Sequence, residues 1–457
     1  MPWFEDPKER YEAAPFLTAL RTAIERWPGP DAPPRFLVAF SGGVDSTVLL
    51  AALARLGLNT RLRAAHVDHG LNPDSAAWAA QCAGVAAGLG VAFESVRVTV
   101  EGIADHGLEA AARDARYRAL RTVLAPGEVL LTAHHADDQL ETLLLRFMRG
   151  SGVRGLRGII AFGPFGPGFL GRPLLGFTRA ELRAQALEWN LRWIEDPANR
   201  EPRHDRNFLR RDVLPQLDAR WPAAVVHAGR LAEQMTDAES ILDAVAEQDA
   251  AGLDDPLRLP RATLAALDSA RQRNLLRHLL RRAGLGVPSA VKIEELRHAL
   301  LEARADAQPL VRWPGGEGRV FRGQLHLLGA LPATSPRDYS TRLPARGPWS
   351  GPEGALAFER AAVEPGLPES WLDEGLTLKF RAGGEEFLPL GRRHRQPLKR
   401  WLQEAAILPW MRSRIPLLFR GAQLVAVGDL WLAAETRAAD STEPRWRVQW
   451  TGHPPLK

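Results

Sequence analysis

Cysteine and lysine are both scarce in this sequence. Cys82 is the single cysteine among 457 residues, which excludes an internal disulfide, a zinc site built only from cysteines and a relay between two thiols. The few lysines lie at positions 8, 292, 379, 399 and 457. None is near the glycine-rich stretch SGGVDS at residues 41–46, so this stretch is not the nucleoside-triphosphate loop that ends in Gly-Lys-Ser/Thr.

Long apolar runs are also missing. No run approaches the roughly 20 apolar residues that span a bilayer, and the N-terminal stretch MPWFEDPKERYEAA has no apolar signal core. With 45% hydrophobic and 25% charged residues over 457 positions, the composition indicates a globular protein of several domains. We expect a cytoplasmic protein with no membrane partner.

Strand-like and helix-like segments alternate through residues 35–215. The expected strands cover residues 36–40, 60–67, 91–98 and 128–133, and the expected helices cover residues 47–56, 74–89, 107–124 and 136–149. This alternation predicts an α/β domain with a parallel sheet and helices on both faces.

The rest of the chain divides by composition into three parts. Residues 216–330 predict a mainly helical middle domain that ends in short strands. Residues 331–354 are rich in Pro and Gly and predict a linker, and residues 355–457 predict a small α+β domain. The first domain is therefore expected to cover residues 1–215.

The stretch SGGVDS lies where the first expected strand passes into a helix. Two glycines at such a point often form only a tight turn. However, the backbone N–H groups at a helix start have no partners within the helix, and glycine lets an anion approach them closely. The stretch is therefore a candidate cradle for phosphate.

Polar clusters follow other expected strands of the same domain. In a parallel sheet, ligands bind beyond the carboxyl ends of the strands. HVDHGL (residues 66–71) follows the second strand, and HHADDQLET (residues 134–142) follows the fourth. HVDHGL is more typical of a structural or ligand-contacting loop than of a zinc site, because neighbouring strand residues rarely converge on one metal ion. For HHADDQLET, a polar face that contacts a ligand and an ordinary solvated helix face both remain open.

Basic residues gather in three places. Arg113 and Arg116 of ARDARY are three residues apart and share a helix face, where they could grip phosphates or pair with nearby acids. RHDRNFLRR (residues 203–211) forms a second cluster. Residues 391–415 hold seven Arg or Lys against one acid, Glu404, which suits a polyphosphate partner but also fits a solvated surface.

The motifs, in their order, resemble a known family. SGGVDS is similar to the pyrophosphatase loop (PP-loop) of the N-type ATP pyrophosphatases. The series SGGVDS, HVDHGL, ARDARY, TAHHADDQLET, RGSGVRGL, RPLL, WIEDPAN and RNFLRRDVLP resembles the tRNA(Ile)-lysidine synthetases within that superfamily, over residues 36–215. FRAGGEEF and PLKRWLQEAAILPWMRSRIPLL, within residues 380–432, resemble that family's terminal tRNA-binding domain.

The resemblance implies a fold and a reaction. Residues 1–215 would form an adenine-nucleotide α-hydrolase-like (PP-loop) domain. ATP would adenylate C2 of cytidine 34 in the CAU anticodon of tRNA(Ile) and release pyrophosphate. The side-chain amine of free L-lysine would then displace AMP and form lysidine. Mg²⁺ would accompany ATP, and a homodimer is compatible with the sequence, which does not fix the oligomeric state.

The resemblance also implies roles for particular residues. The ATP cradle would be Ser41, Gly42, Gly43, Val44, Asp45 and Ser46, and the catalytic residues would be Asp45, Arg113, His134, Asp137 and Glu141. Asp45 would also hold Mg²⁺, and both Asp45 and Glu141 would bind the lysine ammonium. The tRNA-binding residues would be Arg206, Arg210, Arg392, Arg393, Lys399 and Arg400.

Other readings must explain the same loop. A sulfur-inserting tRNA enzyme of this superfamily normally needs more cysteines than Cys82 provides, and an amide-forming synthetase normally brings a glutaminase or takes ammonia. The protein could also be a non-catalytic RNA-binding scaffold in which the loop is vestigial. The acidic residues at positions 45, 137, 138 and 141 argue against a scaffold.

Overall fold

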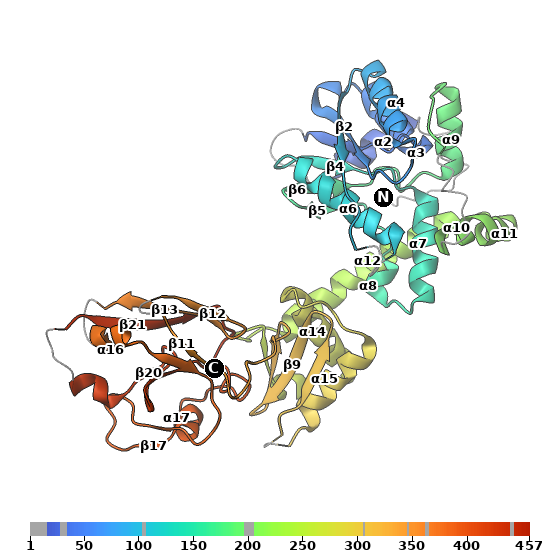
Figure 1. The fold of residues 1–457 in the computed structure, drawn as a ribbon. Coiled ribbons are helices and arrows are strands. Elements are labelled where there is room, and N and C mark those ends of the chain that lie inside the picture. Colours follow the sequence, from blue (N-terminus) through green and yellow to red (C-terminus); the bar gives the residue numbers. More distant parts are fainter. Residues whose placement is uncertain are drawn as a thin grey trace. The chain divides into compact units, whose positions relative to one another are not determined.

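A computed structural model describes residues 16–27, 34–102, 107–195, 205–304, 307–344, 347–361, 365–438 and 443–457 (Figure 1). The end of the WIEDPAN motif and the start of RHDRNFLRR therefore lie outside the described residues. The chain forms two compact units, Met1–Leu242 and Asp243–Lys457.

The first unit is built on one six-stranded sheet with the order β3-β2-β1-β4-β6-β5. The strands are β1 Phe36–Ala39, β2 Leu62–Asp68, β3 Ala92–Arg97, β4 Val129–Leu131, β5 Phe162–Phe165 and β6 Gly168–Gly171. All neighbours are parallel except β5 and β6. The predicted parallel sheet is thus confirmed, and its order reverses between β1 and β4, which is where open sheets of this kind bind ligands.

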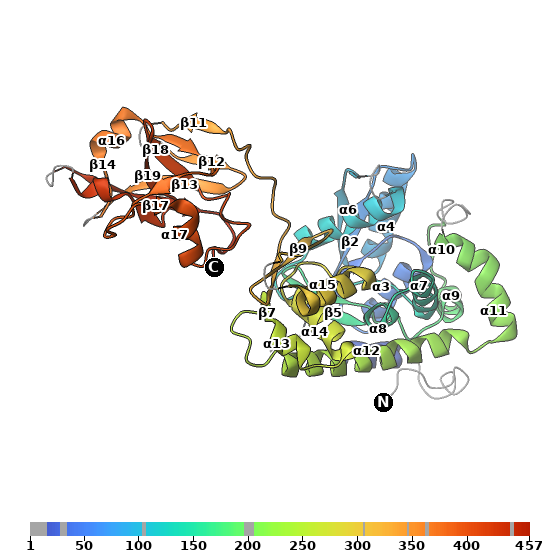
Figure 2. The same ribbon diagram turned by 90° about the horizontal axis from the view of Figure 1, so that it is seen from below.

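Helices accompany this sheet. They are α2 Phe16–Glu25, α3 Val44–Arg55, α4 Ser75–Gly88, α6 Leu108–Val123, α7 Ala136–Met148, α8 Val153–Leu156, α9 Arg179–Glu188, α10 Asp205–Phe208, α11 Leu214–Arg220 and α12 Ala224–Asp249, with a π-helix at Leu209–Val213. Figure 2 shows α12 as one long continuous helix.

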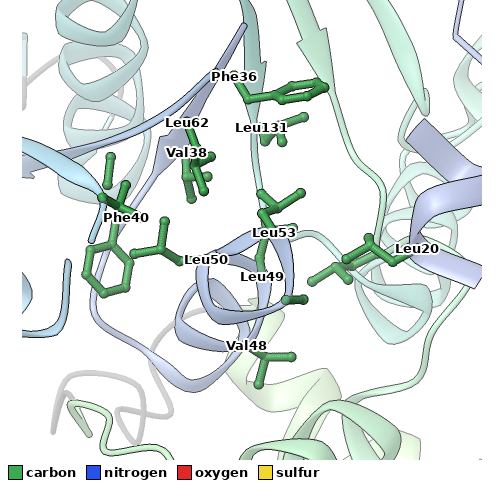
Figure 3. Close-up of a cluster of buried hydrophobic side chains, with 14 of the residues drawn as sticks. Leu20, Phe36, Val38, Phe40, Val48, Leu49, Leu50, Leu53, Leu62 and Leu131 are labelled. Atoms are coloured by element: carbon green, nitrogen blue, oxygen red, sulfur yellow. The ribbon is translucent and has the colours of Figure 1, made fainter. Parts of the chain in front are cut away.

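The core of the first unit surrounds α3. Its residues from Ser46 to Leu53 are all buried, and Leu49, Leu50 and Leu53 pack with Phe36 and Val38 of β1 (Figure 3). A helix buried on every side cannot shift without opening the core. The loop that precedes α3 therefore has a rigid support.

The β5–β6 hairpin is a feature that sequence reasoning missed. Its sequence FGPFGPGFLG is dense in Gly and Pro, residues that normally interrupt strands. The turn contains Gly166 at φ +55°, and β6 gains its place by pairing with β4. Tertiary pairing therefore overrides the local composition.

The second unit begins with helices packed on an antiparallel sheet. The sheet has the order β7-β10-β9-β8, with β7 Arg258–Pro260, β8 Leu310–Trp313, β9 Gly316–Phe321 and β10 Gln324–Leu328. The helices are α13 Arg261–Ala265, α14 Ser269–Arg282 and α15 Ala290–Glu302. The part expected to be mainly helical thus also contains a four-stranded sheet, whose leucines share one core with the helices.

The remainder of the second unit holds two larger antiparallel sheets and a two-stranded pair. Their orders are β11-β15-β18-β19-β20, β12-β13-β21-β14 and β16-β17. The strands are β11 Ser340–Arg342, β12 Trp349–Gly351, β13 Gly354–Arg360, β14 Leu367–Pro368, β15 Thr377–Lys379, β16 Glu386–Phe387, β17 Gln396–Pro397, β18 Leu417–Arg420, β19 Gln423–Val427, β20 Trp431–Leu432 and β21 Arg445–Thr451. Two helices, α16 Glu369–Glu374 and α17 Leu398–Glu404, complete this part.

The Pro/Gly-rich residues 331–354, expected to form a linker, include two of these strands. β11 pairs with β15, and β12 pairs with β13. Each has only three residues, so neither leaves a periodic pattern in the sequence. Among the described residues, no helix is both long enough and apolar enough to cross a membrane.

Candidate functional site

The SGGVDS stretch forms a fixed loop between β1 and α3. Gly42 has φ +83°, a conformation that side chains disfavour, and Gly43 is the residue before the helix. The hydroxyl of Thr47 donates to the Gly43 carbonyl at 2.9 Å, and that of Ser46 donates to the same oxygen at 3.0 Å. No described side chain caps the α3 N-terminus, so its first amides can receive an anion.

α3 begins at Val44, three residues before the expected start at residue 47. The helix starts directly after the second glycine, so Asp45 lies in its first turn. The side chains of Ser41 and Ser46 lie 3.1 Å apart, oxygen to oxygen. Asp45 therefore stands beside the expected phosphate cradle rather than in a loop before the helix.

A cavity of about 810 Å³ opens at this loop. Its lining includes residues from the loop, from the end of β2, from α6, from the start of α7 and from α10. Among them are Ser41, Gly43, Asp45, Ser46, His66, Asp68, His69, Arg116, His134, Asp138 and Arg206. This volume suits a nucleotide-sized ligand. The cavity therefore brings together five of the motifs that were separate in the sequence.

His135 joins the loop to α7. This buried side chain places its Nε2 atom 3.7 Å from Asp45 Oδ2 and 3.6 Å from Asp138 Oδ2, and its Nδ1 atom 3.5 Å from Asp137 Oδ2. The backbone N–H of His135 donates to Asp138 at 3.0 Å. Asp137 also accepts the Arg179 backbone N–H at 2.8 Å, which ties α7 to the start of α9.

Two arginines cover the carboxylates of α7. Arg206 donates from Nε to Glu141 at 2.6 Å and from Nη2 to Asp138 Oδ1 at 3.0 Å. Arg210 makes the same two kinds of bond, with 2.7 Å to Asp138 Oδ1. Glu141 is only 1% exposed. One of its oxygens accepts from Arg206 and the other from Arg210.

The environment shifts the pKa values of neighbouring side chains in different directions. Burial raises the pKa of Asp45, although the nearby His135 opposes this. Burial also lowers the pKa of His134 to about 3, so its ring is neutral at pH 7. For Asp138, burial favours the neutral acid, but His135 and the two arginines outweigh it and lower the pKa to about 2. Asp138 is therefore firmly ionised.

A second, strongly basic cavity of about 1040 Å³ lies in the same unit. Seven arginines line it, namely Arg113, Arg146, Arg149, Arg154, Arg157, Arg172 and Arg206. Leu108, His134 and Arg206 line both cavities. The basic cavity and the cavity at the loop therefore meet at these three side chains, of which His134 and Arg206 are polar.

Internal contacts hold the arginines of the basic cavity in place. Arg146 donates to the carbonyls of Gly155 and Gly158, both at 2.7 Å. Arg154 and Arg157 pair with the buried Glu239 of α12 at 2.8 and 2.7 Å. A fixed group of guanidiniums can receive several phosphates with little reorganisation.

The structure places the other expected residues as follows. Arg113 lines the basic cavity, whereas Arg116 lines the cavity at the loop, and both stack over Tyr117. In the C-terminal part, Arg392, Arg393, Lys399 and Arg400 are all exposed. Other cations of that segment have internal partners, since Arg395 pairs with Glu435, and Arg414 is buried and donates to the Pro332 carbonyl.

Sequence reasoning missed His135 and most arginines of the basic cavity. His135 stands next to a residue that was selected, and only the structure shows that His135 contacts Asp45, Asp137 and Asp138 while His134 lines the cavities. Arg146, Arg149, Arg154, Arg157 and Arg172 come from α7, the segment around α8 and the end of β6. The RGSGVRGL motif was a partial signal, but no spacing rule joins those segments.

Cys82 offers no reactive thiol. Its side chain is fully buried, and burial raises its pKa to about 11. Its sulfur lies 3.6 Å from His66 Nδ1, beneath the loop. A sulfur carrier needs an accessible thiolate, so this environment disfavours the sulfur-inserting alternative.

Sequence comparisons match the whole arrangement to known proteins. Family profiles match a PP-loop domain at residues 17–217, a TilS substrate binding domain at residues 259–326 and a TilS substrate C-terminal domain at residues 376–450. A tRNA(Ile)-lysidine synthase of Alkalilimnicola ehrlichii is 42% identical, covering 92% of this chain and 94% of its own length. The synthase of the same name from Methylococcus capsulatus is 39% identical over 88% of this chain and 93% of its own, and that from Pseudomonas aeruginosa is 39% identical over 96% and 98%.

Proposed function

The chain belongs to the tRNA(Ile)-lysidine synthase family, and from this premise we propose that it ligates free L-lysine to C2 of cytidine 34 in the CAU anticodon of tRNA(Ile). ATP adenylates the base, pyrophosphate leaves, and the lysine side-chain amine displaces AMP. The observation that carries this proposal is the meeting of the glycine loop, the acids of α7 and the basic cavity at His134 and Arg206.

The loop is suited to the first step. As pyrophosphate leaves, negative charge grows on it, and fixed N–H donors lower the barrier because they need no reorganisation. The amides at the start of α3, with the Ser41 and Ser46 hydroxyls, would supply these donors. We assign the triphosphate of ATP to this end of the cavity.

Mg²⁺ fits the residues at this end. Asp45 Oδ1 is buried without a hydrogen-bond partner among the described residues, while the carboxylate lines the cavity. No group of three or more protein ligands for a metal occurs in the described part of the chain. Mg²⁺ is usually held by one or two carboxylates and by the phosphates of its nucleotide, so Asp45 would hold an ion that arrives with ATP and neutralises phosphate charge.

Asp45 is also our candidate for binding the lysine ammonium in the second step. Glu141 was expected to share that role, but it does not line the cavity, and Arg206 and Arg210 occupy both of its oxygens. We therefore assign Glu141 to holding the two arginines. Lysine has a pKa near 10.4 in water, so its amine must lose a proton before it attacks C2.

The basic cavity would receive the RNA. Its arginines suit the phosphates on either side of an unpaired base, and RNA sequence is read mainly at such bases. His134, neutral and shared by both cavities, would lie beside the base that is modified. The exposed Arg392, Arg393, Lys399 and Arg400 would hold another part of the tRNA.

A direct reaction tests this function. Purified protein, Mg·ATP, labelled lysine and an unmodified tRNA(Ile) transcript with CAU are mixed, and a matched transcript with U at position 34 is the control. We expect lysine to become covalently fixed only to the first transcript, with AMP and pyrophosphate released. RNA-dependent AMP formation without lysine transfer would reject lysine as the acceptor, and absence of any turnover would favour a binding scaffold.

Asp45→Ala separates the steps. It should abolish tRNA-dependent release of pyrophosphate and leave tRNA affinity near that of the unsubstituted protein. Retained pyrophosphate release would remove Asp45 from the adenylation step.

A further inference from the structure

The glycine loop has a cover that comes from a distant part of the chain. Residues 191–195 follow α9, and within them the backbone N–H of Ile194 donates to the Gly42 carbonyl at 2.8 Å. This bond crosses about 150 positions of the sequence. The loop is therefore held by more than its own helix.

The side chain of Ile194 lies directly over Gly42. A methyl group built on the Gly42 Cα would come within 2.5 Å of Ile194 Cδ1 and within 2.8 Å of Cys82 Sγ. Ile194 and Cys82 thus together fill the space that a side chain at position 42 would need. Any side chain at position 42 would therefore have to displace one of the two.

The segment that carries Ile194 is itself anchored. The Leu191 N–H donates to the Ala186 carbonyl of α9 at 2.9 Å, and α9 packs on α3, where Arg55 stacks over Trp189 at 4.3 Å. Leu191, Trp189 and Ile194 all pack against the core that surrounds α3. The position of Ile194 is therefore fixed relative to the helix that the loop begins.

We propose that Ile194 is a positioning residue that holds Gly42 and Gly43 in the conformation that receives the phosphates of ATP. Ile194 does not line the cavity, so it acts through the loop and not on the nucleotide. This inference rests on one part of the proposed function, namely that the loop binds ATP. Gly42 and Gly43 allow the loop several backbone conformations, and Ile194 stabilises one of them.

The test measures Mg·ATP binding to the full chain by calorimetry, without tRNA or lysine. Ile194→Ala keeps the N–H but removes the cover, so the loop should sample other conformations. A fall of the competent fraction to a tenth would weaken ATP binding by about tenfold. Ile194→Val removes Cδ1, the atom nearest to Gly42, but keeps Cγ1, so its ATP affinity should lie between those of Ile194→Ala and the unsubstituted chain.

Leu191→Ala is the matched control. Leu191 packs on the same core and lies in the same segment, but it is not among the nearest atoms over Gly42. It should lower the melting temperature as Ile194→Ala does and leave ATP affinity unchanged. Equal weakening of ATP binding by both variants would reduce Ile194 to an ordinary core residue and overturn the inference.

A second measurement protects the test against misfolding. In the tRNA reaction, Ile194→Ala should raise the KM for ATP and leave the KM for lysine and the tRNA affinity as they were. An unchanged KM for ATP would overturn the inference. If the unsubstituted chain bound ATP but transferred no lysine, the proposed function would fail while the calorimetric comparison would still decide the role of Ile194.

Discussion

At the scale of single residues, the sequence indicated the acids of the site better than their partners. The HHADDQLET stretch was expected to present a polar helix face, and the structure has Asp138 and Glu141 on α7, with His134 just before it. The arginines at positions 206 and 210 were expected on RNA, but the structure places them on Asp138 and Glu141. A guanidinium fits a carboxylate and a phosphate equally well, so residue type alone could not choose between them.

Glu141→Gln tests the weight of this ion-pair network. Glu141 is buried, so loss of its charge leaves two arginines with Asp138 alone. Removing one partner of a buried ion pair costs about 3–5 kcal/mol. We expect the lower end of that range, because Arg206 and Arg210 are 22% and 31% exposed and can be partly rehydrated.

Chemical denaturation gives the free energy of unfolding for this comparison. The control is Glu374→Gln, which removes one charge from the exposed pair between Glu374 and Arg420 and should change stability little. Equal effects of the two substitutions would contradict the importance of burial.

The neutral state of His134 predicts a pH dependence of stability. Burial lowers the pKa of His134 from 6.5 to about 3 in the folded chain. Between these two pH values, His134 is therefore protonated in the unfolded chain and neutral in the folded chain. The sign follows from linkage: His134 should lose its contribution to stability as the pH falls from 6.5 towards 3. His326, with a folded pKa lowered by burial to about 4, acts in the same direction, and His135, with a raised pKa, acts in the opposite one.

Comparison with His134→Gln isolates this one group. Unfolding free energies are measured for both proteins between pH 6.5 and 4.5, above the range where Asp138 is protonated. The unsubstituted protein should lose more stability than the variant across this window. Parallel profiles would show that His134 is not held neutral.

At the scale of elements, periodicity and turn chemistry identified what is locally encoded. β1 and α7 were placed within one residue, and α3 was identified with a start three residues too late, because each has an apolar pattern beside a clear boundary. The β5–β6 hairpin and the three-residue strands β11 and β12 were missed, since their pairing partners decide their conformation. The basic cavity could not be derived from the sequence for a related reason: its arginines come from elements that only the fold brings together.

Glu239 of α12 helps Arg146 of α7 to hold the segment around α8, and its contact predicts a local effect. Glu239 is buried and pairs with Arg154 and Arg157. A hydrogen bond to a charged group contributes about 1.5–3 kcal/mol, so its loss should speed local opening by roughly tenfold or more. In Glu239→Ala, amide hydrogen exchange should accelerate at residues 153–158.

Glu247→Ala is the matched control, because Glu247 is exposed on the same helix. It should leave exchange at residues 153–158 unchanged. Uniform acceleration across the whole first unit in Glu239→Ala would instead indicate global destabilisation and contradict the local role.

At the scale of the whole molecule, the sequence indicated a polyphosphate partner and one of the two basic regions, but of the basic cavity it indicated only Arg113 and Arg206. The exposed cations around residues 392–400 were visible as a run, whereas the arginines of the basic cavity were dispersed. One region belongs to Met1–Leu242 and the other to Asp243–Lys457. If both bind the same tRNA at once, their contributions to the salt dependence of binding should add.

Salt titrations of tRNA binding test this addition. Each phosphate contact contributes about 0.7–0.9 to the slope of log K against log salt. Arg149→Gln in the basic cavity and Arg393→Gln in the C-terminal part should each reduce the slope by about that amount, and the double variant by about twice as much. Arg420→Gln is the control, because Arg420 is already paired with Glu374. An unchanged slope in Arg393→Gln, with a reduced one in Arg149→Gln, would restrict the tRNA interface to the first unit.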